Sequence, residues 1–396
     1  MISSQHPAGI TTLRRLQTAV GGLPSDAELS RLAAARPVTL MLPCHARDLD
    51  TESLAGIVRE LASAPWISRF IVGLDGVEES GLAAARESFA GLAGRVSFLW
   101  TDSPEVTAIE DRLKEVKETT AAGGKGRNVW LGLGLALAWA DSAAPGIVAV
   151  HDCDIRAYSR ELPARLCLPL LRPEFGFRFA KGFYARHSDR LHGRLMRLLV
   201  RPLLQAMEMR AGPVPGLQFL NAFRYPLAGE TAMDLAVAQR LAVTATWGLE
   251  IGLLDEVRRQ LPPSAICQSG LCAAYDHKHQ DLSPDDPGAG LHRMAREVAA
   301  TLLGTISGGS YPWRDEILVT WQACAADALR QAEAESFLNG LDFHRDQEAL
   351  AVRTFGRALE SALELPGAPA LLPSWASAER ACPGILDQLA AGARGA

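Results

Sequence analysis

Two aspartates, Asp152 and Asp154, follow a short apolar segment in the sequence His151-Asp-Cys-Asp154. A strand that ends just before them would place both carboxylates within reach of one hard cation. Mg²⁺ and Mn²⁺ sites use such oxygen ligands together with the phosphates of a substrate. The alternative is an ordinary polar turn after a strand, where aspartate is common. The pattern alone leaves both interpretations open.

A glycine-rich segment, Gly123-Gly-Lys-Gly126, precedes an apolar stretch that is expected to form a helix. The backbone N–H groups at that helix N-terminus and the ammonium group of Lys125 could meet a diphosphate. The segment is not a P-loop, because the GxxxxGK[ST] spacing is missing. Its alternative interpretation is a flexible loop with a solvated lysine.

Two histidines stand in the segment Tyr275-Asp-His-Lys-His279, which follows a strand-like run. A neutral imidazole from this segment could complete the coordination of the cation expected near the aspartates. His277 and His279 could instead be incidental members of a polar loop.

One carboxylate, Glu250, interrupts the otherwise apolar stretch 247–252. Burying a charged group there costs free energy unless the group is hydrogen-bonded or functional. A helix N-terminal cap is the structural alternative for this residue.

These residues need elements that bring them together, and the chain alternates between strand and helix patterns. Apolar runs predict strands at 38–43, 70–75, 96–100 and 146–150, and amphipathic stretches predict helices at 50–62, at 79–92 and from about residue 128. Repeated strand–helix units are typical of a parallel, doubly wound α/β sheet. Ligands bind at the carboxyl ends of such strands, so Pro43, Cys44, Asp75 and Cys153 become candidate binding residues.

The later part of the chain has a mixed pattern and then a helical one. Strands are predicted at 175–180, 218–225 and 265–274, and helices at 190–209, 230–241, 291–303, 313–338 and 346–363. A Pro/Ala/Gly-rich tail, expected to be loosely ordered, follows. We therefore expect a helical leader at 1–36, a catalytic domain at 37–290 and a C-terminal helical region and tail at 291–396.

The composition is that of an ordinary soluble globular protein, with 48% hydrophobic residues and a net charge of −5 from 40 Lys+Arg and 45 Asp+Glu. This balance gives no support for nucleic-acid or membrane binding. The start lacks a secretory-signal pattern, and the seven cysteines include no CxxC pair. We expect a cytoplasmic protein with reduced thiols.

Taken in order, these motifs resemble the glucosyl-3-phosphoglycerate synthases, which are retaining nucleotide-sugar glycosyltransferases of the GT-A fold. The resemblance covers residues from about 38 to about 305. Mannosylglycerate-forming transferases are similar more distantly. The motifs that carry the resemblance are Pro43, Gly124-Lys-Gly126, Asp152-Cys-Asp154, Lys181-Gly-Phe-Tyr184, Gly193-Arg-Leu-Met196, Arg201-Pro-Leu-Leu204, Pro226-Leu-Ala-Gly-Glu230, Gly248-Leu-Glu-Ile-Gly-Leu-Leu254 and Asp276-His277.

The resemblance implies a Rossmann-like donor half at 37–155, a mixed acceptor half at 156–290 and a C-terminal helical extension. It implies that Lys125, Asp152 and Asp154 serve uridine diphosphate and its Mg²⁺ or Mn²⁺, with His277 as a further metal ligand. It places Pro43, Cys44, Asp75, Gly124 and Cys153 around the donor.

The acceptor side departs from the family pattern. Gly193 and Arg194 match the segment that holds the phosphoglycerate, but Met196 replaces its threonine. His279, a further acceptor-binding candidate, stands where the family has asparagine. The acidic residue after the proline of the first strand is shifted to Asp48.

The resemblance implies transfer of a hexose, glucose in the first instance, from UDP-glucose to 3-phosphoglycerate or a related small acid. Such transfer belongs to the synthesis of glucosylglycerate-type compatible solutes. The anomeric configuration is retained, the leaving phosphate accepts the proton of the acceptor hydroxyl, and Glu250 positions that hydroxyl. A GDP-mannose donor or an unphosphorylated glycerate acceptor is the main alternative.

Two further classes remain open. A sugar-nucleotide pyrophosphorylase also uses glycines and acidic metal ligands, but its glycines follow the first strand, where this chain has Pro43-Cys-His. A non-catalytic nucleotide-binding regulator is the other. The C-terminal helices that carry Trp313 and Trp321 could pack on a second subunit in a homodimer or, equally well, on their own core.

Overall fold

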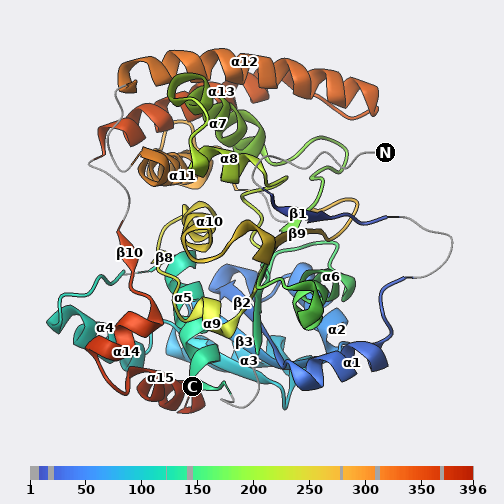
Figure 1. Ribbon diagram of the computed structural model, residues 1–396, viewed down its shortest axis with the longest axis vertical. Helices are drawn as coiled ribbons and strands as arrows, with labels where there is room; N and C mark the ends of the chain where they lie inside the picture. The colour runs from blue at the N-terminus through green and yellow to red at the C-terminus, as the bar shows by residue number, and fades with distance from the viewer. Residues whose placement is uncertain are drawn as a thin grey trace.

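A computed structural model of the chain describes residues 9–16, 22–121, 123–140, 146–276, 280–307, 313–365 and 370–395. Within these residues, an eight-stranded sheet in the order β1-β9-β6-β7-β5-β2-β3-β4 forms the centre of the molecule (Figure 1). Its strands are β1 Thr11–Leu13, β2 Val38–His45, β3 Ile67–Asp75, β4 Val96–Trp100, β5 Ile147–Val150, β6 Phe179–Phe183, β7 Thr231–Asp234 and β9 Ile266–Gly270.

The sheet is mostly parallel, which confirms the α/β class. β2 pairs in parallel with β3 and β5, β3 pairs in parallel with β4, and β7 runs antiparallel to β5 and β6. The predicted strands at 38–43, 70–75, 96–100 and 146–150 are all confirmed within a few residues. The apolar character of β2, β3 and β5 follows from burial on both faces, which is usual for the inner strands of a parallel sheet, whereas β4 is an edge strand and is only partly buried.

Helices cover both faces of this sheet. On β2, Leu40 and Leu42 pack into one apolar cluster and Met41 packs into the other, as the two-residue period of a strand requires. The helices are α1 Asp26–Ala35, α2 Glu52–Ala62, α3 Leu82–Ser88, α4 Pro104–Glu115, α5 Lys125–Ala138, α6 Glu161–Leu171, α7 Arg201–Ala211, α8 Pro215–Asn221, α9 Leu235–Ala238, α10 Leu249–Gln260, α11 Gly290–Ser307, α12 Arg314–Leu338, α13 Arg345–Glu364, α14 Trp375–Ala381 and α15 Ile385–Gly395.

Three local predictions were wrong. The segment 218–225, expected as a strand, belongs largely to α8, because Pro215 starts a helix and Leu217 and Leu220 share one buried helical face. The segment 230–241, expected as a helix, begins with β7, which fills the gap between β5 and β6. In the leader, α1 is helical, but Thr11–Leu13 adds strand β1 to the sheet edge beside β9.

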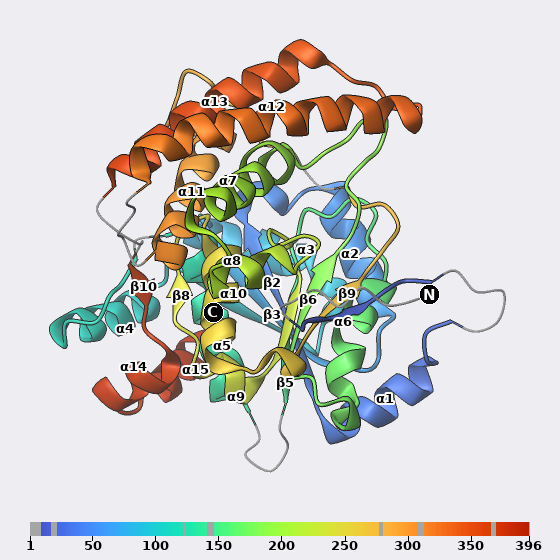
Figure 2. The same ribbon diagram turned by 45° about the horizontal axis from the view of Figure 1, so that its top comes forward.

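The C-terminal region forms two separate groups of helices. α12 and α13 lie along one end of the molecule, where they pack on α7 and α11 (Figures 1 and 2). α14 and α15 lie at the other end against α4 and α5. The expectation of a loosely ordered tail is therefore wrong for residues 370–395.

A pair of stacked tryptophans joins α14 to helix α5, which packs on the sheet. The rings of Trp375 and Trp130 stack with centroids 4.3 Å apart. Trp130 Nε1 donates a hydrogen bond to the Pro373 carbonyl, and Trp375 Nε1 donates one to the Trp130 carbonyl, each at 2.7 Å. A short strand pair, β8 Val243–Thr244 with β10 Leu371–Leu372, lies beside this contact.

No helix in the described part of the chain combines the length and hydropathy that a membrane span requires.

Candidate active site

Lys125 is the first residue of α5 and lies at the carboxyl edge of the sheet. Gly124 precedes it with φ +107°, a conformation that L side chains rarely adopt, which explains a glycine at this turn. Lys125 Nζ is 2.7 Å from Asp152 Oδ1 and 3.0 Å from Glu250 Oε1, and its side chain is 19% exposed. The lysine is thus the centre of a charge cluster, and the interpretation as a solvated loop lysine is wrong.

The electrostatics of Lys125 favour its charged form. Burial by itself would lower the pKa of the ammonium group. The neighbouring carboxylates of Asp152 and Glu250 outweigh that effect and raise the pKa well above its usual range. A permanent positive charge therefore lies at the N-terminus of a helix, where a diphosphate would bind.

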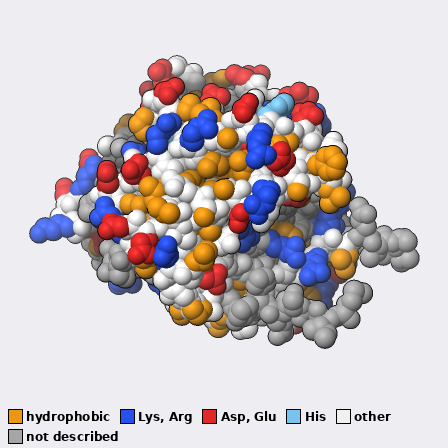
Figure 3. All heavy atoms as spheres, turned by 90° about the horizontal axis from the view of Figure 1, so that it is seen from above, with side chains coloured by type: hydrophobic (Ala, Val, Ile, Leu, Met, Phe, Trp, Pro, Cys, Tyr) orange, Lys and Arg blue, Asp and Glu red, His pale blue; other side chains and the backbone are white. Residues whose placement is uncertain are grey.

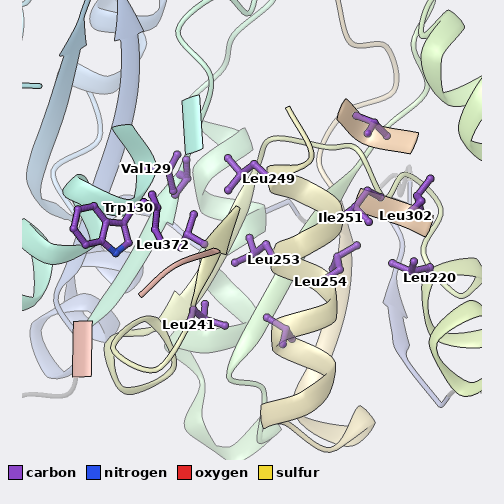
Figure 4. Packing of buried hydrophobic residues seen from close by; sticks show 14 of the residues in the cluster. Val129, Trp130, Leu220, Leu241, Leu249, Ile251, Leu253, Leu254, Leu302 and Leu372 are labelled. Carbon is purple, nitrogen blue, oxygen red and sulfur yellow. The ribbon is translucent and has the colours of Figure 1, made fainter. Parts of the chain in front are cut away.

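Packing of α10 fixes the position of Glu250. Figure 4 shows Leu249 and Leu253 on the side of the helix that faces Leu372, and Ile251 and Leu254 on the side toward Leu302 and Leu220. Glu250 is itself buried in the first turn of this helix, where the backbone dipole favours a carboxylate. The bond to Lys125 gives the buried charge a partner.

Asp152 and Asp154 follow β5 as predicted, in a crowded acidic environment. Burial and the charge of Asp152 raise the pKa of Asp154 to about 7, although Lys125 acts in the opposite direction. The charges of Asp48 and Glu230 also raise this pKa. The two aspartates are not ordinary turn residues, because their charges are concentrated at one buried edge.

A hard divalent cation fits this set of donors. Clustered carboxylates offer the oxygen ligands that such ions prefer, and a bound cation would relieve the repulsion that raises the pKa of Asp154. In the described residues, no three His, Cys, Asp or Glu side chains form a complete metal site. The predicted ligand His277 and the predicted acceptor residue His279 lie outside the described residues.

The other predicted donor residues lie along the same edge of the sheet. Pro43 and Cys44 lie just before the end of β2, and Asp75 is the last residue of the neighbouring strand β3. Asp75 accepts a hydrogen bond from Thr101 Oγ1 at 3.3 Å. A hydrogen bond with Cys44, together with burial, raises the pKa of the Cys153 thiol well above its usual range. Both cysteines are buried beside the charge cluster, and the Cys153 thiol is therefore neutral.

Glu230 is a site residue that the sequence predictions missed. It is fully buried, and it accepts hydrogen bonds from the hydroxyls of Tyr184, at 2.8 Å, and Tyr275. The two tyrosine rings stack with centroids 3.7 Å apart. Burial and the charge of Asp152 raise the pKa of Glu230. The motif 226–230 was the available signal.

Lys181 was missed as well. Its ammonium group is completely buried and donates a hydrogen bond to the Ala228 carbonyl. Burial lowers the pKa of Lys181 to about 8, against the opposing effects of Glu250 and Glu230. The residue ties β6 to the loop before β7, where a Cβ at Gly229 would lie 2.5 Å from Asp152 Oδ2. The motif 181–184 was its signal.

The acceptor candidates Gly193 and Arg194 lie at the start of the π-helical turn Leu195–Val200. Gly193 lies against Tyr225, since a Cβ there would be 2.8 Å from the Tyr225 hydroxyl. Arg194 Nε donates a hydrogen bond to Glu348 Oε1 of α13 at 2.7 Å. The guanidinium is thus paired with the C-terminal region, a contact that the sequence did not predict.

The fold and the cluster together define a class of protein. A mixed sheet with an acidic pair after β5, and a lysine at a helix N-terminus beside it, is the arrangement of a nucleotide-sugar glycosyltransferase with the GT-A fold. No family model matches the sequence.

Comparison with known proteins identifies the family. The chain is 33% identical over 370 residues to the glucosyl-3-phosphoglycerate synthase of Persephonella marina, with 91% of each chain covered. It therefore belongs to the glucosyl-3-phosphoglycerate synthase family. Its fold is similar to that of the Mycobacterium tuberculosis enzyme in complex with Mn²⁺, uridine diphosphate and glucosyl-3-phosphoglycerate. That match has a TM-score of 0.52 and 26% identity, and it covers 75% of this chain and 88% of the other.

A second structure of the mycobacterial enzyme contains Mg²⁺ and uridine diphosphate. It matches with a TM-score of 0.51 and 26% identity, over 75% of this chain and 86% of the other. The family predicted from the motifs and the GT-A fold are thereby confirmed.

Proposed function

We propose that this protein transfers glucose from UDP-glucose to 3-phosphoglycerate, with a divalent cation and with retention of the anomeric configuration. The observation that carries the proposal is the contact of Lys125 with Asp152 and Glu250 at the carboxyl edge of the sheet. The family relationship over 91% of the chain supports the choice of substrates. The Mn²⁺ and Mg²⁺ in the mycobacterial structures support the choice of cation.

On the donor side, Lys125 and the N-terminus of α5 would neutralise the diphosphate. Asp152 and Asp154 would hold the cation, together with His277. When bound, a divalent cation supplies positive charge that stabilises the departing diphosphate. Pro43, Cys44, Asp75, Gly124 and Cys153 would form the surrounding donor surface.

On the acceptor side, Glu250 would accept a hydrogen bond from the acceptor hydroxyl and orient it toward the sugar. Its carboxylate already lies 3.0 Å from Lys125 Nζ, and this ion pair fixes its position. The departing phosphate oxygen would take the hydroxyl proton, so the reaction needs no protein nucleophile. Gly193, Arg194 and His279 would bind the anionic end of the acceptor.

A panel of donors and acceptors tests this proposal. UDP-glucose, UDP-galactose, GDP-glucose and GDP-mannose would each be incubated with 3-phosphoglycerate and with glycerate, with Mg²⁺ or with a chelator. We expect the largest nucleoside diphosphate release with UDP-glucose, 3-phosphoglycerate and Mg²⁺. If the protein binds UDP-glucose but shows neither glucose transfer nor slow hydrolysis of the donor, a non-catalytic regulator would be favoured. In a separate reaction with added pyrophosphate, conversion of UDP-glucose to UTP and glucose 1-phosphate would indicate a pyrophosphorylase.

Unphosphorylated glycerate is the second candidate acceptor, and two observations favour it. Met196, which replaces a threonine of the family pattern, is buried in the apolar core and offers no hydroxyl. Arg194 is already paired with Glu348. If glycerate is the natural acceptor, kcat/KM for glycerate will exceed that for 3-phosphoglycerate in the same panel.

We also propose a cytoplasmic location and a homodimer. The seven cysteines are free thiols, as a reducing compartment favours. Trp321 is fully buried in its own core, which is one of the two positions that the sequence left open for it. Val319, Phe337 and Leu338 of α12 are exposed, and Figure 3 shows this end of the molecule with apolar side chains among charged ones. Light scattering of the purified protein will give the oligomeric state.

A further inference from the structure

Segment 189–194, which ends at the proposed anion anchor Arg194, contacts the C-terminal region through an ion pair and through a backbone hydrogen bond. Arg194 donates to Glu348 through Nε, at 2.7 Å, and to Gln347 Oε1 through Nη2, at 3.3 Å. At the start of the same segment, the Asp342 N–H donates a hydrogen bond to the Asp189 carbonyl at 2.8 Å. The first turn of α13 therefore lies directly beside Arg194, the proposed anion anchor.

Glu348 is a buried carboxylate that serves two arginines at once. Its side chain is 6% exposed, and its Oε2 lies 3.0 Å from Arg197 Nη2. Among the described residues, Arg197 Nη1 is buried without a hydrogen-bond partner. Arg190, Arg194, Arg197 and His344 line one small cavity with Glu348 and Asp342. The local charge at the anchor is therefore set by the balance of these arginines against Glu348.

We propose that Glu348 is a specificity-determining residue of the acceptor site. Its carboxylate cancels one unit of positive charge beside Arg194, so it weakens the attraction for an acceptor in proportion to the acceptor's negative charge. A phosphorylated acid carries more charge than glycerate and loses more of this attraction. Glu348 thus shifts the preference toward the less charged acid. This inference rests on the proposed function, because it assumes that Arg194 faces the acceptor.

The neutral isostere Glu348→Gln tests the inference. The amide keeps the shape and one acceptor oxygen for the arginines but removes the charge. We expect the ratio of kcat/KM for 3-phosphoglycerate to kcat/KM for glycerate to rise about tenfold, while KM for UDP-glucose stays within about twofold. The rise should largely persist at high ionic strength, since Glu348 is buried and salt screens buried charges much less than exposed ones.

Asp346→Asn is the matched control. Asp346 is an exposed residue in the same turn of α13, so its substitution removes the same charge from the same helix. The acceptor ratio should change by less than about twofold. An equal rise in both variants would mean that the general charge of α13, and not Glu348, sets the preference, and it would overturn the inference.

Gln347→Glu provides a test in the opposite direction and does not depend on the folding of the Glu348 variant. Gln347 is exposed, and its Oε1 already contacts Arg194. Adding a charge there should lower the acceptor ratio several-fold. An unchanged or raised ratio in this variant, or an unchanged ratio in folded Glu348→Gln, overturns the inference.

Failure of the proposed function would be recognised separately. In that case the wild-type protein would transfer glucose to neither acid, whatever residue stands at position 348. Calorimetric titration with 3-phosphoglycerate alone would then decide the inference. Binding about tenfold tighter to Glu348→Gln than to wild type supports it, and equal or weaker binding overturns it.

Discussion

Trp375 of α14 and Glu348 of α13 both come from the C-terminal region, but they contact the proposed donor side and the proposed acceptor side in different ways. Trp375 is fully buried and stacks on Trp130 of α5, the helix that begins with Lys125. Glu348 contacts Arg194 and Arg197 through charge–charge hydrogen bonds. The C-terminal region thus contacts the proposed donor side mainly through buried aromatic packing, and it contacts the proposed acceptor side through ion pairs.

This difference has a physical consequence. Apolar packing fixes a position with little regard to ligand charge, which suits a site for a constant diphosphate. Ion pairs beside a ligand change the local potential, so one substitution can change which acid is preferred. We therefore expect damage on the donor side to reduce stability or turnover, and changes on the acceptor side to alter selectivity.

The largest expected effect is on stability, at the donor side. Trp375→Ala should lower the free energy of unfolding by about 3–5 kcal/mol, because it leaves a cavity against Trp130 and removes a buried hydrogen bond. Urea denaturation will measure the change. Leu16→Ala is the control, since this side chain is 70% exposed and its loss should cost about 0.5 kcal/mol or less. Equal losses would contradict the account of the tail.

The next effect is on turnover. Asp154→Ala should lower kcat at least ~100-fold, or ~2.7 kcal/mol, the loss that follows removal of a catalytic electrostatic group or ligand. Its stability should hold, because burial and like charges already disfavour the carboxylate. Steady-state kinetics at saturating UDP-glucose will measure kcat. Activity within tenfold of wild type, or full activity in excess chelator, would exclude the metal assignment.

On the acceptor side, Arg194→Lys should raise the acceptor KM about ten- to hundredfold, since a lost bidentate charge-assisted contact costs ~1.5–3 kcal/mol. Donor affinity should stay near the wild-type value, because Arg194 contacts α13 and not the Lys125 cluster. Acceptor titrations at fixed UDP-glucose will show the change. A loss confined to donor affinity would break the distinction between the two sides.

The smallest effect concerns the buried Lys181. Its pKa of about 8 in the fold lies below the ordinary 10.5, so the fold disfavours its charged form. That cost is fully present below about pH 8 and disappears as the pH approaches 10.5. The stability of the wild type relative to Lys181→Met should therefore rise by about 2 kcal/mol between about pH 7.5 and about pH 9.5. A difference independent of pH would contradict the assignment of a buried, titrating lysine.

The sequence predicted the donor side better than the acceptor side, for reasons that particular residues show. Asp152 and Lys125 could be placed because each directly follows or begins an element whose apolar pattern is clear. The contact of Arg194 with Glu348 joins residues 154 positions apart, and nothing local announces it. In β7, pairing with two neighbouring strands decided the structure of 231–234 against its local helical pattern.

Glu230 and Lys181 show a second limit. Both residues belong to motifs that are visible in the sequence, but a single sequence does not reveal that their side chains are fully buried. A lysine with no exposed surface and a glutamate between two tyrosines become recognisable only when the strands that carry them are paired. Residues that act inside the charge cluster are thus harder to predict than residues at strand ends.

The most direct test of the central claim is a proton NMR spectrum of the reaction of wild-type protein with UDP-glucose, 3-phosphoglycerate and Mg²⁺. The account predicts that the anomeric signal of UDP-glucose is replaced, in equal amount, by that of an α-glucoside of phosphoglycerate, and that chelator stops the change. Unchanged UDP-glucose, a β-glucoside, or turnover unaffected by chelator would contradict it.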